Sequence, residues 1–235
     1  VAHGHSSLME RALKELREFS AGISASKRLP LGRVIFIAGN VATPEGAKDL
    51  ASWGADCLKV GIGPGSMCTT RVVTGAGYGQ LSAIADCAHA ANGACIIADG
   101  GIRNSGDATK ALAAGADAVM MGRVLAGTHE VPAWARESGT YRGMASAEAQ
   151  GSFYGYSFSN RHPEGVATQV PSRGPITDVL GPFLGGVRSG LSYVGARNIS
   201  ELREFAEFVE CAPGVVAESL PHGLMPEYGR ELKRS

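Results

Sequence analysis

The sequence predicts an α/β fold in which a parallel sheet is covered by helices. Apolar runs start near Val34, Cys57, Cys95 and Ala118, alternate with helical segments and end in glycines. Strands that are apolar on both faces and alternate with helices are typical of parallel sheets. No run is followed by G-x-G-x-x-G with an acidic residue about twenty positions on, the pattern of a Rossmann sheet. We therefore favour a (β/α)8 barrel.

The first unit sets the pattern for the others. The β-branched and aromatic run from Val34 to Ala38 predicts a strand that ends at Gly39-Asn40. Pro44 is suited to the first turn of a helix, and an amphipathic segment follows as far as Trp53, where Gly54 predicts the end.

Three further strands and two helices repeat this order. The ranges are strand 57–60, helix 81–91, strand 95–98, helix 107–114 and strand 118–121. Glycine makes up 33 of the 235 residues, about twice the usual ~7%, and it collects at the strand ends, where a chain turns sharply or admits a ligand close to the backbone.

The periodic pattern lapses after Gly127 and resumes at Ile176. Residues 139–174 are rich in glycine and aromatic residues and too long for an ordinary connection, which predicts a mobile active-site flap, with a surface hairpin as the alternative. Helices are predicted over 176–191 and 199–209, and an irregular tail from Pro213.

Composition limits the classes of partner. Lys plus Arg (22) cancels Asp plus Glu (22), so we expect no nucleic acid partner. No apolar run approaches the roughly 18 to 20 residues of a membrane span, so we expect no membrane partner. The five cysteines contain no C-x-x-C pair, which fits a reducing compartment such as the cytoplasm.

The densest chemical signal is the loop 61–71, directly after a predicted strand. Its alternating glycines expose amides that can hold an anion and carbonyls that can ring a hard cation. Ser66 could add a hydroxyl to a phosphate. Cys68, with Thr70 two residues on, is placed where a thiol can act as a nucleophile, although an arbitrary cysteine is more often a small buried hydrophobe.

Two other strand ends carry similar groups. Asp99 offers a carboxylate suited to ribose hydroxyls, and the backbone amides of Gly101 and Gly122, with the cation of Arg123, suit a phosphate. The alternative for Asp99 is a helix cap or a salt bridge. Together the three strand ends predict a site for a nucleoside monophosphate.

These segments resemble the IMP dehydrogenase and GMP reductase family. The resemblance is carried by GIGPGSMCTTR (61–71), TGAGYGQLSAI (74–84), ADGGIRNSGDATKALAAGADAVMMG (98–122), YRGM (141–144) and GGVRSGLSYVGA (185–196), and it extends over residues 1 to about 218. It implies a (β/α)8 barrel that acts on a purine nucleotide with a nicotinamide cofactor, and a homotetramer.

The resemblance also implies a role for each matching residue. Cys68 would attack purine C2 and hold a covalent thioimidate, with Thr70 and Glu164 managing the proton. Substrate would be bound by Ser66, Asp99, Gly101, Gly122, Arg123, Tyr141, Gly143, Met144, Arg161 and Gly165. The cofactor would lie at His3, Ser6, Asn40 and Lys59, and potassium at the carbonyls of Gly63, Gly65 and Cys68.

Within the family, the pattern favours a GMP reductase that uses NADPH. The flap is short and lacks the Arg-Tyr dipeptide of the dehydrogenases, and Thr70, Arg161 and Glu164 match reductase positions. The alternative is an IMP dehydrogenase that uses NAD, because Ala145 and Pro163 depart from the reductase pattern and the segment ADGGIR is closer to that of the dehydrogenases. Arg123, in contrast, stands where dehydrogenases carry Ser.

Counting units adds a second alternative. A complete barrel has about 250 residues, yet only four strand-helix units are evident, so we expect the chain to hold the C-terminal part of one catalytic barrel domain spanning 1–235. Such a chain could also be a nucleotide-binding fragment without catalytic activity.

Overall fold

The computed structural model describes residues 4–25, 34–154, 162–219 and 221. The chain divides into two compact units, Val1–Phe205 and Ala206–Ser235. The sheet and the candidate site belong to the first unit. The second unit contains one short helix among the residues that the structure describes, α10 (Val215–Glu218).

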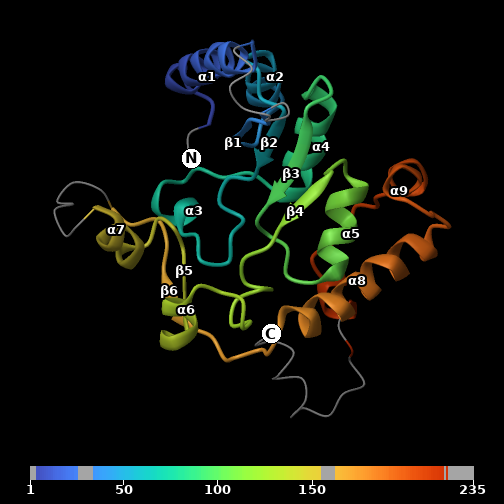
Figure 1. Ribbon diagram of the computed structural model, residues 1–235. Helices are drawn as coiled ribbons and strands as arrows, with labels where there is room; N and C mark the ends of the chain where they lie inside the picture. The colour runs from blue at the N-terminus through green and yellow to red at the C-terminus, as the bar shows by residue number, and fades with distance from the viewer. Residues whose placement is uncertain (1–3, 26–33, 155–161, 220, 222–235) are drawn as a thin grey trace. The chain divides into compact units, whose positions relative to one another are not determined.

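A parallel four-stranded sheet is the framework of the first unit (Figure 1). Its strands are β1 (Ile37–Val41), β2 (Cys57–Val60), β3 (Cys95–Asp99) and β4 (Ala118–Met120), and they lie in sequence order. This arrangement confirms the predicted α/β class and parallel sheet. Because all four strands run the same way, their carboxyl ends and the loops that follow meet along one edge.

Three helices pack beside the sheet: α2 (Pro44–Ser52), α4 (Gln80–Ala90) and α5 (Ser105–Ala113). The start of α2 follows from local chemistry, because the Thr43 side chain accepts from the Gly46 amide and Pro44 occupies the first turn. Asn104 caps α5 in the same way, by accepting from the Asp107 amide. The predicted starts of these three helices agree with the structure to within two residues.

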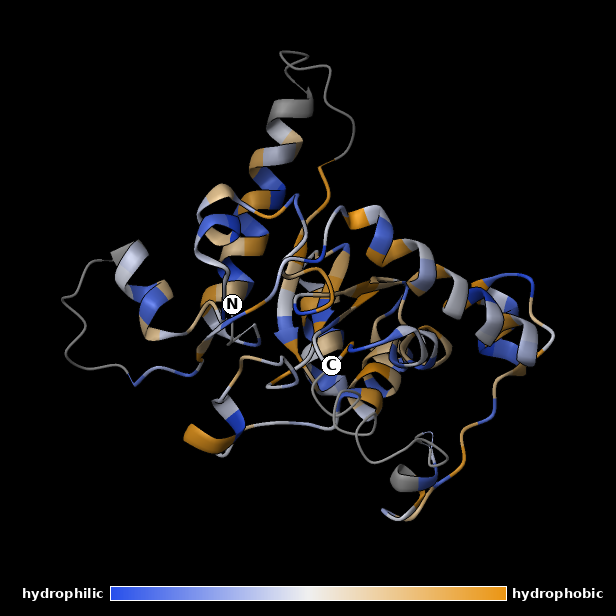
Figure 2. Ribbon diagram, turned by 90° about the horizontal axis from the view of Figure 1, so that it is seen from below, coloured by the Kyte–Doolittle hydropathy of each residue, from blue (hydrophilic) through white to orange (hydrophobic). Residues whose placement is uncertain are grey.

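Alternate strand residues face these helices and form the core. Leu58 and Val60 on β2 and Ile96 on β3 are almost fully buried, together with Leu50 from α2 and Ile84 from α4. Figure 2 shows the hydrophobic character of the strands beside the mixed character of the helices. Because side chains alternate along a strand, the residues between these belong to the opposite face, which carries the polar groups of β2 and β3.

The first strand departs from the prediction. β1 begins at Ile37, not Val34, and continues through Gly39 and Asn40 to Val41. The expectation that it ends before Gly39 was wrong, because Gly39 pairs with Lys59 in the parallel register. A Cβ on Gly39 would lie 2.5 Å from the Lys59 carbonyl oxygen, so glycine allows this close pairing instead of ending the strand.

A long helix, α1 (Ser7–Ala25), is not predicted from the sequence. Leu13 anchors it in the core, being 4% exposed. Arg17 donates to the Gly54 carbonyl at 2.7 Å, forms an ion pair with Asp56 and stacks over the ring of Phe36 at 4.4 Å. These contacts join α1 to the chain segments that directly precede β1 and β2.

The expected lapse of regular structure between 127 and 176 is wrong in part. This stretch contains α6 (Ala133–Ser138), β5 (Thr140–Arg142), α7 (Ala147–Tyr154) and β6 (Ala167–Gln169). β5 and β6 pair antiparallel, so regular backbone hydrogen bonds hold strands that are too short to show a clear periodicity.

The remaining helices are α3 (Thr70–Val73), α8 (Ile176–Tyr193) and α9 (Ile199–Phe205). The prediction of α8 is confirmed, whereas α9 ends four residues before the predicted Val209, and α10 interrupts the tail expected to be irregular. No helix in the described ranges has both the length and the apolar character required to cross a bilayer.

Candidate active site

The loop 61–69 joins β2 to α3 and presents Cys68 at the carboxyl edge of the sheet. Gly61 has a φ of +145°, and a Cβ there would lie 2.3 Å from the Asp99 carbonyl oxygen, so only glycine fits. The Gly61 amide donates to Val41 at 2.8 Å, and the Cys68 amide donates to Gly65 at 3.0 Å. These bonds fix both ends of a turn on which the Cys68 side chain is exposed.

Cys68, Thr70 and Glu164 form a chain of hydrogen bonds. The Cys68 thiol donates to Thr70 Oγ1 at 3.1 Å, and the Thr70 hydroxyl donates to Glu164 Oε2 at 2.8 Å. Thr70 and Glu164 are 94 positions apart in the sequence. The predicted trio of nucleophile, hydroxyl and carboxylate is therefore brought together in one place.

Backbone hydrogen bonds also hold Glu164 in this place. The Glu164 carbonyl accepts from the Thr69 amide at 2.9 Å, and the Val166 amide donates to Met67 at 3.0 Å. Cys68 and Gly165 form an isolated antiparallel bridge. The returning end of segment 139–174 is thus pinned along the cysteine loop, which orients the carboxylate toward Thr70.

The other end of the same segment lies beside this bridge. The Gly143 amide donates to Val166 at 3.0 Å, and the Glu164 amide donates to Ala145 at 3.0 Å. A Cβ on Gly165 would lie 3.1 Å from both the Met67 carbonyl oxygen and the Ser146 amide nitrogen, so a larger residue would crowd the two backbone segments that pack against Gly165.

Asp99 is the centre of a second polar cluster. Its Oδ2 accepts from Asn40 Nδ2 at 2.8 Å and lies 2.7 Å from Lys59 Nζ. Asn40 also donates to the Gly61 carbonyl at 2.9 Å, which links this cluster to the cysteine loop. The salt bridge offered as an alternative for Asp99 does exist, and the same carboxylate also lines the cavity described next.

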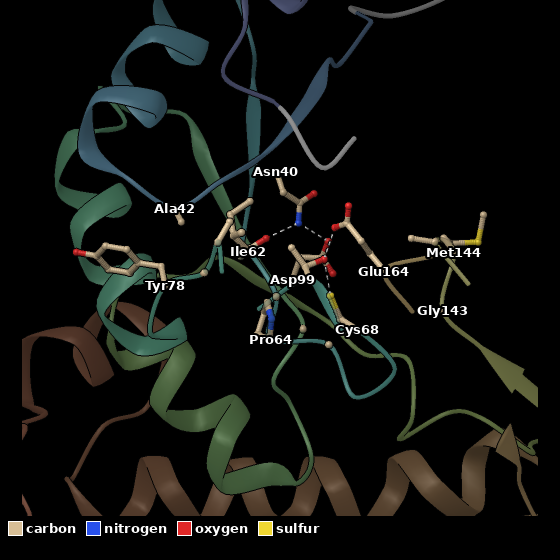
Figure 3. A pocket seen from close by; sticks show the side chains of 18 of the residues that line it. Asn40, Ala42, Ile62, Pro64, Cys68, Tyr78, Asp99, Gly143, Met144 and Glu164 are labelled. Carbon is tan, nitrogen blue, oxygen red and sulfur yellow. Dashed lines mark hydrogen bonds between the residues drawn. The ribbon is translucent and has the colours of Figure 1, made fainter. Parts of the chain in front are cut away.

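The two clusters open into one cavity of about 860 Å³. In Figure 3 Cys68, Asp99 and Glu164 lie close together below Asn40, with Tyr78 at one side and Met144 at the other. Eleven of the predicted site residues line it: Asn40, Gly63, Gly65, Ser66, Cys68, Thr70, Asp99, Tyr141, Gly143, Met144 and Glu164.

Gly122 belongs to a neighbouring cavity of about 320 Å³. Tyr141 and Met144 line both cavities. A Cβ on Gly122 would lie 2.3 Å from the Tyr141 hydroxyl oxygen, so this glycine makes room for the tyrosine.

Other predicted residues lie outside the lining of both cavities: Ser6, Lys59, Gly101, Arg123 and Gly165. Lys59 and Gly165 are nevertheless connected to the site through Asp99 and Cys68. Ser6 accepts from the Met9 amide at 3.3 Å, as a residue at the start of α1 does. His3 and Arg161 lie outside the described residues.

No role is predicted from the sequence for Tyr78, which lines the large cavity. Its hydroxyl donates to Asp86 Oδ2 at 2.8 Å, and this hydrogen bond raises the pKa of Tyr78. Tyr78 is the aromatic residue of the motif 74–84, which is the only sequence signal that marks it.

Cys87 differs from Cys68, because it is a small buried hydrophobic residue of the core. It is fully buried, and burial raises its pKa to about 12.

Comparisons with known proteins agree with this geometry. The chain matches the family model described as "IMP dehydrogenase / GMP reductase domain" over residues 1–222. It is 46% identical over 236 residues to an inosine-5'-monophosphate dehydrogenase of Staphylococcus saprophyticus, covering 94% of this chain and 46% of that protein. An inosine-5'-monophosphate dehydrogenase of Aquifex aeolicus is 47% identical, with the same two coverages.

A solved structure supports the same relationship. The chain superposes with a TM-score of 0.83 and 40% identity on a GMP reductase of Trypanosoma brucei crystallised in complex with guanosine 5'-monophosphate, covering 96% of this chain and 46% of that one. The chain therefore spans about half the length of the relatives it matches, and its sheet and helices form part of a (β/α)8 barrel. It belongs to the IMP dehydrogenase / GMP reductase family.

Proposed function

We propose that this chain carries the active site of a GMP reductase, which converts GMP to IMP and ammonia with NADPH. The observation that carries the proposal is the hydrogen-bonded chain from the Cys68 thiol through Thr70 to Glu164. A carboxylate joined to a nucleophile through one hydroxyl can deliver a proton to a leaving amine, which the loss of ammonia requires.

The proposed reaction uses these three side chains in order. Cys68 Sγ adds to C2 of the purine, and the C2–N bond breaks as the amine leaves with a proton passed from Glu164 through Thr70. The product is a thioimidate on Cys68. When bound, NADPH supplies the hydride that ends at C2 as the C–S bond breaks, and Cys68 is then free for the next turnover.

The chain's polar groups fit a nucleoside monophosphate. The exposed Ser66 hydroxyl, the amides of Gly101 and Gly122, Arg123 and the Tyr141 hydroxyl would hold the phosphate, and Asp99 would hold the ribose. Gly143, Met144, Gly165 and Arg161 would contact the base.

The cavity also suits a cofactor beside the substrate. Its volume of about 860 Å³ lies in the upper part of the range of roughly 300–1,000 Å³ for small-molecule sites. His3, Ser6, Asn40 and Lys59 are the proposed contacts to the nicotinamide. Asn40 and Lys59 already converge on Asp99, so they would orient cofactor and ribose together.

A potassium ion would be held by the backbone carbonyls of Gly63, Gly65 and Cys68. Carbonyl oxygens are hard ligands of the kind that such cations prefer, and the loop turns tightly enough for the Cys68 amide to donate to Gly65. The proposal extends to a homotetramer in the cytoplasm, with no nucleic acid or membrane partner.

A second candidate is an IMP dehydrogenase, which oxidises IMP with NAD to XMP. It is favoured by the curated relatives, because the two proteins of that name described above are 46% and 47% identical to this chain. In that case water attacks the thioimidate and no amine leaves. Glu164 and Thr70 would then not be needed to protonate a leaving amine.

One pair of assays on the full-length protein separates the candidates. A reductase oxidises NADPH faster with GMP than without it, whereas a dehydrogenase reduces NAD with IMP. The Cys68→Ser variant is the control, because a hydroxyl is a much weaker nucleophile near neutral pH and either activity should disappear. Nucleotide binding without turnover in both assays would overturn both candidates and support the non-catalytic fragment.

A further inference from the structure

One side chain connects the two strands whose ends carry the site. Gln80 is the first residue of α4, and its Nε2 donates to the Val60 carbonyl at 2.9 Å and, by a longer bond, to the Asp99 carbonyl at 3.4 Å. Val60 is the last residue of β2, and Asp99 is the last residue of β3. A single amide group therefore bridges the carboxyl ends of these neighbouring strands.

The bridge lies where the pairing of the two strands stops. The register between β2 and β3 ends at the pair Val60 and Ala98. The Cys68 loop begins at the next residue, Gly61, where a Cβ would lie 2.3 Å from the Asp99 carbonyl oxygen. Gln80 thus continues the connection between the strands past the end of their ladder.

Both loops pack directly against the Gln80 side chain. A Cβ on Gly61 would lie 2.9 Å from Gln80 Oε1 and 3.0 Å from its Nε2, and a Cβ on Gly101 would lie 3.5 Å from its Cγ. The Cys68 loop therefore needs glycine where it passes the amide. The path of each loop depends on where Gln80 lies.

Stability alone does not explain a glutamine at this position. Gln80 Oε1 is buried and has no hydrogen-bond partner within the part of the chain that the structure describes. A buried acceptor without a partner costs free energy, so an apolar side chain would be the better choice for stability. Turning the amide over would place Oε1 against two carbonyl oxygens. What the amide provides is the pair of hydrogen bonds that it donates to the strand ends.

The relative position of these strand ends matters for the proposed reaction. Asp99 would hold the ribose, whereas C2 of the purine must meet Sγ of Cys68 on the other loop (Figure 3). Lys59 and Asn40 hold the Asp99 carboxylate, and Gln80 holds its backbone carbonyl. A shift between the two loops would leave the nucleotide bound by its ribose but move C2 away from Cys68.

We propose that Gln80 is a positioning residue, which sets the spacing between Asp99 and the Cys68 loop so that a nucleotide bound through its ribose presents C2 to Sγ. Gln80 lines neither of the two cavities described above, so it acts through these residues. The proposal rests on the proposed function only in placing the ribose at Asp99 and C2 at Cys68. It applies equally to a reductase and a dehydrogenase, since both would form the bond between Cys68 and C2.

The first experiment separates catalysis from binding in Gln80→Met, which keeps an unbranched side chain of similar length and removes both donors. At saturating nucleotide and cofactor, kcat should fall about 100-fold, since a misplacement of about 1 Å can cost a factor of that size. Nucleotide affinity, measured by calorimetric titration of the full-length protein, should change much less, because every group proposed to bind the nucleotide is still present. Gln169→Met, at an exposed glutamine of β6, is the matched control and should retain both values.

The second experiment measures the position of the base without turnover. Iodoacetamide alkylates exposed thiols, and the tryptic peptide 60–71 contains Cys68 as its only cysteine, so mass spectrometry follows this residue alone. Saturating GMP or IMP should slow the alkylation of Cys68 in the wild type, because the base covers Sγ. At saturating nucleotide this protection should be weaker in Gln80→Met and fully kept in Gln169→Met.

Gln80→Glu is the second variant if Gln80→Met does not fold. It keeps the shape of the side chain and puts an oxygen in place of Nε2, facing the two carbonyl oxygens. It should therefore lose kcat and the protection of Cys68 at least as strongly as Gln80→Met.

Failure of the proposed function and failure of this proposal give different results. A wild type in which neither nucleotide slows alkylation would overturn both. With a protected wild type, the role of Gln80 alone is overturned by an unchanged kcat, by a loss of affinity without a loss of kcat, or by full protection in a folded Gln80 variant. A fall in kcat no larger than the loss of folded protein, measured by circular dichroism, would overturn it as well. If the wild type binds nucleotide without turnover, the protection of Cys68 decides.

Discussion

The Thr70 hydroxyl lies between the Cys68 thiol, at 3.1 Å, and the Glu164 carboxylate, at 2.8 Å. One hydroxyl thus connects the candidate nucleophile with the candidate acid. Neither the thiol nor the carboxylate is linked to the other directly, so the proton path depends on residue 70.

Replacing Thr70 by Val keeps the side-chain shape and removes the hydroxyl. We expect kcat to fall by about 100-fold or more, since a positioned acid or base contributes roughly 10²–10⁴. Glu164→Gln should cause a similar loss, measured by steady-state turnover with the active nucleotide and cofactor. Thr168→Val, an exposed threonine on β6, is the matched control and should leave kcat unchanged. Full turnover in Thr70→Val would remove Thr70 from the mechanism.

The charge of Asp99 should decide nucleotide affinity. Asp99→Asn keeps the size of the side chain, weakens the proposed bonds to the ribose and leaves Lys59 without its ion-pair partner. Hydrogen bonds to charged groups contribute about 1.5–3 kcal/mol, which corresponds to roughly 10- to 100-fold weaker binding. Calorimetric titration with GMP and IMP measures the change, with Asp178→Asn, an exposed residue of α8, as the control. Unchanged affinity would place the ribose elsewhere.

Gly122 should tolerate no larger side chain while Tyr141 is present. In Gly122→Ala the new Cβ would lie 2.3 Å from the Tyr141 hydroxyl oxygen, so the tyrosine must move and nucleotide binding should weaken. Adding Tyr141→Phe removes that oxygen and leaves the next ring atom 3.3 Å away, so the double variant should recover its folded stability. Thermal melts measure this recovery, and Gly181→Ala, with open space around the new Cβ, is the control. Equal melting temperatures for the single variant and the wild type would contradict the clash.

A pH-dependent contribution to stability is expected from Asp107. Burial alone would raise its pKa, but hydrogen bonds from the Arg103 side chain and amide lower the pKa overall. A lowered carboxyl pKa stabilises the fold above the ordinary value of about 3.9, and this contribution is lost as the pH falls through the folded-state pKa.

Asp107→Asn should therefore lower the free energy of unfolding near about pH 6 and have a much smaller effect near about pH 2. Denaturant unfolding at both values measures the difference. Asn104→Ala removes the neutral cap of the same helix, so it should cost about 1 kcal/mol at either pH. An effect of Asp107→Asn that is equal at both pH values would exclude the Arg103 interaction as its cause.

Parts of the fold can be predicted because they depend on local chemistry. Cys57–Val60 and Cys95–Asp99 are short apolar runs ended by glycines, and Pro44 with Thr43 before it determines the start of α2. Helix α1 could have been found from Met9, Leu13 and Leu16, which are spaced four and three residues apart. Gly39 misled the prediction, because its lack of a side chain serves close pairing with Lys59 and not a turn.

The sequence by itself determined the parallel α/β class, the carboxyl-edge loops and the identity of Cys68, Thr70, Asp99 and Glu164 as candidates. Only the tertiary structure decided which of these groups meet. Glu164 reaches Thr70 because backbone bonds join Met67 and Thr69 to residues 164–166, and Asp99 meets Lys59 because β2 and β3 are neighbours. The contact of Gln80 with both strand ends is of the same kind, since it depends on how α4 packs beside β2 and β3 and not on the residues next to Gln80.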